Sequence, residues 1–441
     1  MLFLWPAALH SRQRPLHLVS ARGWWPGRGG WVFAHRCAGL TLALFLIVSG
    51  ATGAAIAFQD ELDEWLNPGW FRTGQGGAPL PPQRLVEILE AADTRFRVQY
   101  LPLGLAPGRA ARLMVEPRSE AGDTASGEGL DFDEMFVDPA SGRVLGTRRW
   151  GACCLQRRQL MPFLYELHHR LLLPGEAGRV LLGGVALLWT FDSVIGFYLT
   201  FPAGPRAGTA PATDSAVARS RTRRSWWRRW GASWSIKRRA GWSRVNWDLH
   251  RAGGLWFWGL LIALAVSGTS LNLGEEIVEP ALTVFSELTP SPFDEREEVL
   301  TEEPLTPVLS FDEALRRADA EARPLGWPAA AGMFYNAAYG IYGVHFGRDK
   351  DTGWGARYVY VDGADGRILG RHEPGVGTAA DRFMDLQLPL HSGRIAGTAG
   401  RTLVAASGIA VVVLSVTGVL IWLRKRRSGA YRTVHASRAA G

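Results

Sequence analysis

Four long apolar runs divide the chain into alternating hydrophobic and polar stretches. They span residues 37–58, 180–201, 255–273 and 403–423. Each run is close to the roughly 20 residues that an α-helix needs to cross about 30 Å of hydrocarbon. The pattern predicts an integral membrane protein with four transmembrane helices. The first run ends without a small-residue cleavage site, so we expect it to remain as a helix.

Positive charge is concentrated beside these runs. The chain is 47% hydrophobic and 20% charged, with a net charge of +8, and its Lys and Arg residues cluster before the first run, between the second and third, and after the fourth. Basic segments near helix ends are retained in the cytoplasm. Both termini are therefore expected to be cytoplasmic in a multi-pass protein. A Trp-Arg cluster at 225–234 fits anionic lipid at the bilayer surface better than nucleic acid.

This topology gives nine expected segments. They are a basic cytoplasmic N-terminal segment 1–34, transmembrane helices 35–59, 179–201, 250–273 and 400–423, outer domains 60–178 and 274–399, a basic cytoplasmic loop 202–249 and a basic cytoplasmic tail 424–441.

The two halves of the chain resemble each other. Residues 35–40 match 250–255 at an offset of 215, and 136–146 match 360–370 at an offset of 224. His169, followed by Gly178-Arg179, matches His391, followed by Gly400-Arg401, at an offset of 222. We infer an internal duplication in which each unit is helix, outer domain, helix. The units are expected to pack about a pseudo-two-fold axis along the membrane normal.

Each outer domain shows one helical pattern followed by strand-like segments. Apolar residues recur with helical spacing around Leu85, and again after Ser310, a plausible N-cap. Strand candidates follow at 111–115, 134–137, 340–346 and 357–361. The predicted fold is therefore four transmembrane helices with two small α+β domains.

Several motifs resemble a known family. The hairpin ending Val-Asp-x-x-x-Gly-Arg-Val-Leu-Gly at 137–146 is similar to the PepSY domain, and the stretches 162–169 and 196–202 resemble the PepSY-associated transmembrane family. The resemblance covers nearly the whole chain after about Trp31. Within that family it is closest to ferric-siderophore reductases of the ferrioxamine type in the bacterial inner membrane. This resemblance implies PepSY-like periplasmic domains, two b haems and reduction of a ferric siderophore in the periplasm.

Four histidines occupy equivalent places in the two halves. His35 and His250 stand at the cytoplasmic starts of helices one and three, and His169 and His391 at the outer starts of helices two and four. Polar groups beside membrane helices are costly and are usually kept for a function. Pseudo-symmetry pairs His35 with His250 and His169 with His391, so that each pair can ligate one haem iron. His168 is the alternative to His169.

Arginines accompany these histidines. Arg36, Arg251 and Arg170 directly follow a histidine, and Arg394 lies one helical turn after His391. A guanidinium matches a carboxylate such as a haem propionate. The same side chains could instead bind lipid phosphates.

Other polar residues leave alternatives open. Asp192 interrupts an apolar run and could hydrogen-bond a ligand histidine, relay protons or cap a helix. The vicinal Cys153 and Cys154 lie outside, where a strained disulfide could form, although a structural role is favoured over electron relay. His345 and His372, in the second outer domain, are read as surface or packed histidines rather than as docking groups.

The expected reaction is one-electron reduction of a ferric chelate at the outer face. Reduction lowers the charge of the iron and weakens its binding to hard oxygen donors. The electron donor, a cytoplasmic flavoprotein or a quinol, is left open, because the chain has no fused flavodoxin or flavin-reductase domain. The alternative is a non-enzymatic membrane scaffold or protease modulator, which would hold no cofactor.

Overall fold

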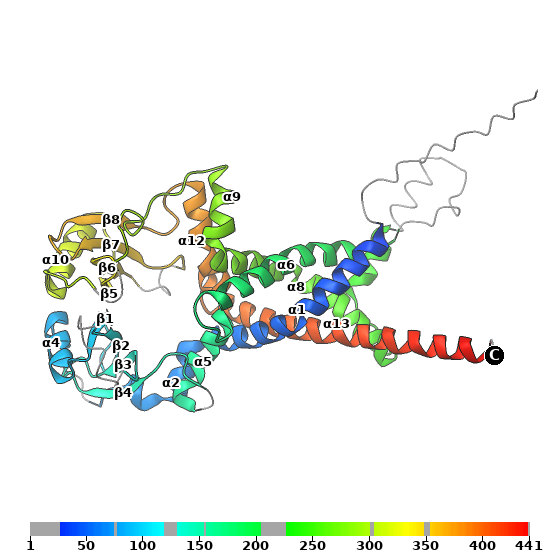
Figure 1. Ribbon diagram of the computed structural model, residues 1–441, viewed down its shortest axis with the longest axis horizontal. Coiled ribbons are helices and arrows are strands. Elements are labelled where there is room, and N and C mark those ends of the chain that lie inside the picture. Colours follow the sequence, from blue (N-terminus) through cyan, green and yellow to red (C-terminus); the bar gives the residue numbers. More distant parts are fainter. Residues whose placement is uncertain are drawn as a thin grey trace, which may run out of the picture.

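The computed structural model has a bundle of long helices at one end and a β-sheet at the other (Figure 1). It describes residues 27–74, 77–118, 130–153, 156–203, 226–299, 304–347 and 353–439. Much of the N-terminal segment 1–34 and of the loop 202–249, together with Cys154, lies outside the described residues. Because the sheet lies at one end and the C-terminal tail at the other, we refer below to the sheet side and the tail side of the bundle.

In the part of the chain that the structure describes, four helices are long and apolar enough to cross a membrane. They are α1 (Arg28–Ile56), α6 (Ala177–Thr200), α8 (Trp242–Asn272) and α13 (Gly397–Ala439). The prediction of an integral membrane protein is thus confirmed. Helices α1 and α8 begin seven to eight residues earlier than expected and α13 ends later, because the helical backbone continues beyond the apolar runs.

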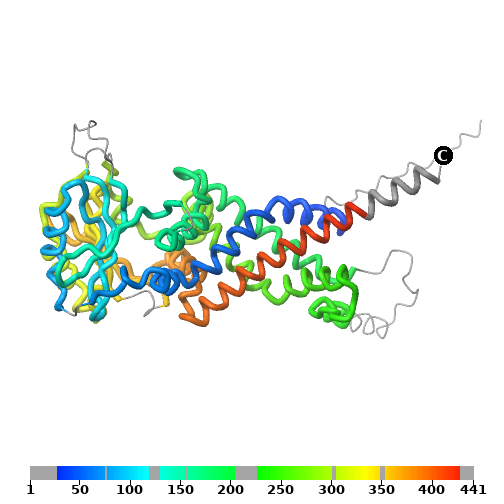
Figure 2. The backbone as a smooth tube through the Cα atoms, turned by 90° about the horizontal axis from the view of Figure 1, so that it is seen from below, coloured from blue at the N-terminus to red at the C-terminus, as the bar shows by residue number. Residues whose placement is uncertain are grey.

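The bundle is closely packed between α1 and α13 and between α6 and α8. Figure 2 shows α1 and α13 running side by side. Gly50 and Gly408 face each other there, and a Cβ added to Gly50 would lie 2.7 Å from the Gly408 carbonyl oxygen. Side chains at these two positions would force the helices apart.

Short helices connect the bundle to the sheet. On the first pass they are α2 (Gln59–Leu66), α3 (Pro68–Phe71) and α5 (Arg157–Arg170), and on the second they are the π-helical η2 (Gly274–Val278), α9 (Glu279–Thr283), α12 (Ala379–Ser392) and the 3-10 turn η4 (Arg394–Ala396). The 3-10 turns η1 (Ala232–Trp234) and η3 (Arg323–Leu325) lie elsewhere. Helices α5 and α12 are separate from α6 and α13, a break that the sequence analysis did not anticipate.

Eight antiparallel strands form one sheet in the order β4-β3-β2-β1-β5-β6-β7-β8. The strands are β1 (Phe96–Pro102), β2 (Ala111–Pro117), β3 (Glu134–Val137), β4 (Val144–Arg148), β5 (Ala330–Asn336), β6 (Ile341–Phe346), β7 (Arg357–Asp362) and β8 (Ile368–His372). The predicted strands correspond to β2, β3, β6 and β7, and the predicted hairpin at 137–146 and its match at 360–370 include the starts of β4 and β8. Strands β1 and β5 were missed.

Strands β1 and β5 join the two halves. Tyr100 pairs with Phe334 and Leu101 with Met333, so the four strands of each half form one continuous sheet. The sequence predicted two small α+β modules but not this junction.

Helices α4 (Pro82–Ala92) and α10 (Phe311–Ala322) cover the face of the sheet that points away from the bundle (Figure 1). Ser310 caps α10 by accepting a hydrogen bond from the Glu313 amide, as predicted. One hydrophobic core, containing Leu89, Phe311 and Val344, lies between these helices and both halves of the sheet. The order of one helix, four strands, a short helix and a long helix thus occurs twice.

Candidate functional site

Two histidine pairs bridge the halves of the bundle. On the tail side, His35 of α1 faces His250 of α8, with ring centroids 6.3 Å apart and planes inclined at 52°. On the sheet side, His168 of α5 faces His391 of α12, with centroids 6.1 Å apart and planes inclined at 55°. The nearly equal geometry of the two pairs points to a common role. We call them the tail-side pair and the sheet-side pair.

His168, rather than His169, is the partner of His391. The preferred pairing of His169 with His391 is therefore corrected by the structure. The ring of His169 instead stacks on Tyr165 at 4.1 Å and 17°. Neighbouring residues of an α-helix point about 100° apart, so only one of the two can face across the bundle.

A one-residue difference between the halves explains the error. A side chain on Gly178 would collide with the carbonyl oxygen of Arg170, and one on Gly400 with that of Gly393. The glycines match at an offset of 222, but Arg170 and Gly393 differ by 223. The first connection therefore holds one extra residue, where Leu171 and Leu172 both adopt positive φ. The sequence prediction aligned the histidines by their distance from the Gly-Arg motif, and in the first half this distance selected His169 in place of His168.

Hydrogen bonds fix the tautomer of all four imidazoles. Their Nδ1 atoms lie 2.8 to 3.1 Å from acceptors on neighbouring helices. These acceptors are Asp192 for His35, Leu414 O and Thr417 Oγ1 for His250, Ser49 O and Thr52 Oγ1 for His168, and Ser267 Oγ for His391.

Each Nδ1 must therefore carry the hydrogen. Carbonyls and a carboxylate only accept, and the Ser267 hydroxyl already donates to the Ala263 carbonyl. With Nδ1 protonated, a neutral imidazole presents a lone pair on Nε2, the form that ligates metals. An acceptor behind the imidazole also orients the ring and raises its basicity.

A glycine lies beside each imidazole. A Cβ added at Gly196 would lie 3.3 Å from His35, at Gly418 3.1 Å from His250, at Gly53 2.9 Å from His168 and at Gly268 3.5 Å from His391. Gly53 and Gly268 differ by 215 residues and Gly196 and Gly418 by 222, two of the offsets at which the sequences of the two halves match. The rings thus pack against bare backbone in both halves.

The spacing of the pairs can be tested against a metal. Two imidazole–metal bonds of about 2 Å, plus roughly 1 Å from each nitrogen to its ring centre, place the centroids roughly 6 Å apart. Both pairs match this separation. Among the described residues, no group of three or more His, Cys, Asp or Glu side chains could hold a metal ion. Two imidazoles alone suit a metal whose remaining ligands come from a macrocycle.

The pairs lie at different depths. His35 and Gly53, which contacts the sheet-side pair, are 18 residues apart on α1, and His250 and Gly268 are 18 apart on α8. At 1.5 Å per residue this is about 27 Å. The two pairs therefore occupy opposite ends of the bundle.

The predicted arginines are divided among several contacts. Arg170 forms an ion pair with Glu166, and Arg251 contacts Asp248 at 3.0 Å. Arg36 stacks over Phe33, and Arg394 begins η4. The Nε of Arg251 is buried and has no hydrogen-bond partner in the part of the chain that the structure describes. Arg251 therefore offers a buried donor beside a paired histidine.

The remaining candidates lie away from the pairs. Cys153 is disulfide-bonded, and His345 belongs to β6 beside Tyr100. His372 Nε2 lies 3.2 Å from Asp385, whose hydrogen bond raises the pKa of that imidazole. The sequence did not predict any of these three residues as an iron ligand.

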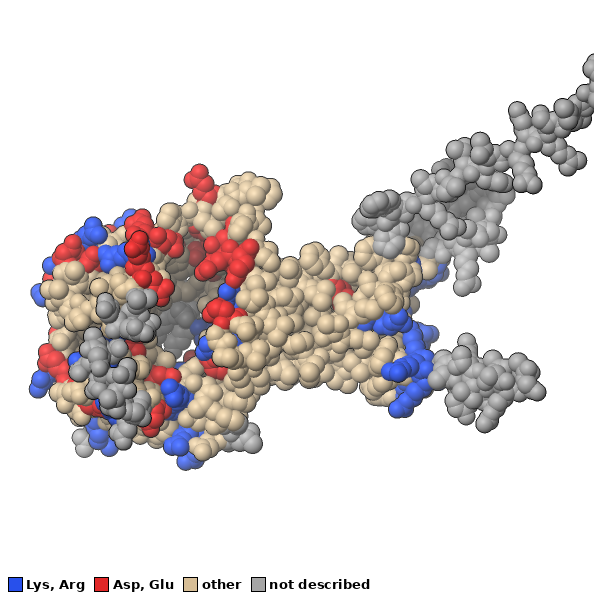
Figure 3. All heavy atoms as spheres, in the orientation of Figure 1, with Lys and Arg blue, Asp and Glu red and all other residues tan. Residues whose placement is uncertain are grey.

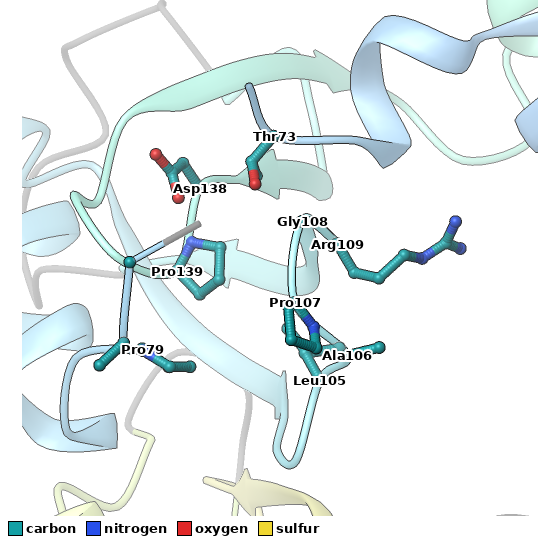
Figure 4. Close-up of a pocket in the computed structure, with 11 residues that line it drawn as sticks. Thr73, Pro79, Leu105, Ala106, Pro107, Gly108, Arg109, Asp138 and Pro139 are labelled. Atoms are coloured by element: carbon teal, nitrogen blue, oxygen red, sulfur yellow. The ribbon is translucent and has the colours of Figure 1, made fainter. Parts of the chain in front are cut away.

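A pocket of about 190 Å³ lies in the first half of the sheet domain, between Pro79, Pro107 and Pro139 (Figure 4). Its lining contains no histidine. Arg109 points away from it and binds Glu64 at 2.6 Å. We assign it no part in the site.

Sequence reasoning missed the groups behind the rings. Thr52 and Ser267 are equivalent at an offset of 215, as His35 and His250 are, and both bind the sheet-side pair. Hydroxyls inside apolar runs were a signal that could have revealed them. Asp192, in contrast, was foreseen as a possible partner of a histidine.

Comparison with known proteins agrees with this architecture. A search of curated proteins found no match. The family described as the PepSY-associated TM region matches residues 32–425, which include all four paired histidines. The chain therefore belongs to the PepSY-associated transmembrane family.

Proposed function

We propose that this protein is a haem b-containing membrane reductase that passes electrons from the cytoplasmic side, or from the membrane, to a ferric siderophore in the periplasm. The observation that carries the proposal is the presence of two histidine pairs, with centroids 6.1 and 6.3 Å apart and each Nδ1 hydrogen-bonded. A bare zinc or copper site would normally recruit further protein ligands. Haem needs only two axial ligands from the protein.

The orientation rests on charge. Figure 3 shows Lys and Arg gathered at the end of the bundle opposite the sheet, while the face of the bundle in view between them and the sheet is almost free of charge. Arg238, Arg239, Arg244 and Arg424 belong to that end. By the positive-inside rule this end is cytoplasmic and the sheet is periplasmic. The twice-occurring element order supports a duplicated origin for the two PepSY-like halves.

Each residue of the site then has a defined task. His35 with His250, and His168 with His391, would hold the two haems, which supply reversible one-electron chemistry when bound. The Nδ1 acceptors orient the imidazoles, and the adjacent glycines leave space for them. Arg251, whose Nε is unsatisfied, would donate a hydrogen bond to a propionate near the cytoplasmic side.

The direction of electron transfer indicates where the substrate would bind. The sheet-side pair lies beneath the periplasmic sheet, and Figure 3 shows the surface hollowed between sheet and bundle, with acidic side chains nearby. A ferric chelate docked there would accept one electron, and the ferrous product would bind its oxygen donors less tightly. The electron donor is a cytoplasmic flavoprotein or a membrane quinol.

Absorbance tests the proposal. Purified full-length protein is expected to show a Soret band and a sharp α-band on reduction, with two haems per chain. The dithionite-reduced protein, held without oxygen, should be reoxidised by ferric siderophores. A folded, colourless protein would favour the non-enzymatic scaffold instead, and a pigmented protein whose spectrum no ferric chelate changes would remove the substrate assignment.

A further inference from the structure

The four Nδ1 acceptors differ in charge. His250, His168 and His391 donate to carbonyl or hydroxyl oxygens, which are neutral. His35 alone among them donates to a carboxylate, that of Asp192, at 2.8 Å. The two iron sites of the proposed function would therefore have different electrostatic surroundings.

This difference breaks the internal repeat. Helices α6 and α13 match at an offset of 222, which relates Gly196 to Gly418 beside the tail-side pair. The same offset relates Asp192 to Leu414, which serves His250 only through its backbone carbonyl. One half thus has a carboxylate where the other has an apolar side chain.

The carboxylate is placed at a costly position. Asp192 is only 7% exposed and lies within the membrane-spanning α6. An acidic group at such a depth is expensive and is kept where it has a function. A neutral acceptor would orient the His35 ring equally well, as the other three histidines demonstrate, so orientation alone does not account for the charge.

Resting on the proposed function, we propose that Asp192 holds the midpoint potential of the tail-side haem below that of the sheet-side haem. A carboxylate behind an imidazole makes it a more basic ligand, and a nearby negative charge favours the more positive, ferric state. At equilibrium an electron shared between the sites then resides on the sheet side. One site is oxidised as the other is reduced, and no bond forms or breaks. Asp192 acts through His35, so it is a positioning and tuning residue.

Potentiometric titration of the full-length protein tests this. The wild type should show two one-electron waves whose midpoint potentials differ by at least about 59 mV, which is tenfold in the equilibrium constant for electron transfer between the two sites. His35→Ala should abolish the lower wave, which assigns it. Asp192→Asn keeps an oxygen acceptor but removes the charge. It should raise the lower midpoint potential by a similar amount and leave the upper midpoint potential unchanged. Asp192→Glu should keep the lower wave low.

Thr52→Val is the matched control, because it removes a neutral acceptor from His168 and leaves the Ser49 carbonyl. It should not move the lower wave. Coincident midpoints in the wild type, an unshifted lower wave in a D192N variant that retains both haems, or an equal shift in T52V would each overturn the inference. A colourless wild type would instead overturn the proposed function, so the two failures are distinguishable.

Discussion

Arg401 clamps the carboxylate of Glu61 with two hydrogen bonds, Nη1 to Oε1 at 2.8 Å and Nη2 to Oε2 at 2.6 Å, across 340 residues of sequence. Its Nε also binds the Ala57 carbonyl at the end of α1. Arg179 does the same to Glu276 and the Asn272 carbonyl at the end of α8. An arginine of each half therefore binds a glutamate of the other half at the sheet side of the bundle, close to the sheet-side pair.

The ion pair between Arg401 and Glu61 should stabilise the fold weakly, and this stabilisation should be lost in acid. The Arg401 hydrogen bond holds the pKa of Glu61 below its ordinary value, so the contribution is present at neutral pH and is lost as the pH falls through that lowered pKa. Glu61 is largely exposed, so a double-mutant cycle with Glu61→Gln and Arg401→Gln should give a coupling of about 0.2–1 kcal/mol. Thermal unfolding at low and high salt measures it; a coupling unchanged in 1 M salt would contradict the screened ion pair.

His168 and His169 provide a matched pair of variants. His168→Ala should lose the haem proposed at the sheet-side pair, whereas His169→Ala should keep it, because the His169 ring stacks on Tyr165 and does not face His391. The haem-to-protein ratio, read from the reduced α-band, distinguishes them. Equal loss in both variants, or loss only in H169A, would show that the pairing is wrong.

Gly53, whose backbone lies closest to a paired imidazole, should tolerate no side chain. Gly53→Ala would place a Cβ 2.9 Å from His168, whereas nothing lies within 4 Å of a Cβ at Gly39 on the same helix. We expect G53A to displace the ring and lower haem content, at a cost of about 1–3 kcal/mol for overpacking, and G39A to match the wild type. Parallel losses in both variants would indicate a general effect on α1.

A buried ionic network anchors the first half of the sheet to the bundle. Arg148 is fully buried and binds Asp63 of α2 at 2.6 Å as well as Glu134 of β3. Arg148→Met would leave buried carboxylates without this partner, which typically costs about 3–5 kcal/mol. Arg84→Ala, which breaks an exposed pair with Glu87, should change stability by less than about 0.5 kcal/mol. Chemical denaturation of both variants provides the comparison.

The thermal stability of the second half of the chain should depend on pH through His372. The Asp385 hydrogen bond raises the pKa of this imidazole above 6.5, so its stabilisation is complete below that value and is lost as the pH rises through the raised pKa. Asp385 lies on α12, the helix that carries His391. Melting temperatures measured from pH 5.5 to 8.5 should decline across this window in the wild type and less in Asp385→Asn. The same slope in both proteins would exclude the pair as its source.

The sequence contained enough to predict the membrane helices and three of the four histidines that the structure brings into pairs. Apolar runs and internal offsets depend on local composition, which a single chain reveals directly. The fourth histidine was misassigned because one extra residue near Leu171 shifts the register, and a shift of one residue turns a helix by about 100°. Strand β1 does alternate, with Phe96 and Val98 buried and Arg97 between them, but this pattern was overlooked. The pairing of β1 with β5 depends on contact between the two halves, which no pattern within either half reveals.

The junction of β1 with β5 also bears on how the chain is made. Residues 100–102 pair with residues 332–334, so during synthesis the first four strands have an open edge while more than 200 further residues are added. Such an edge is a template for aggregation. A factor that shields nascent strands outside the membrane would therefore matter more for the yield of this protein than for its finished stability.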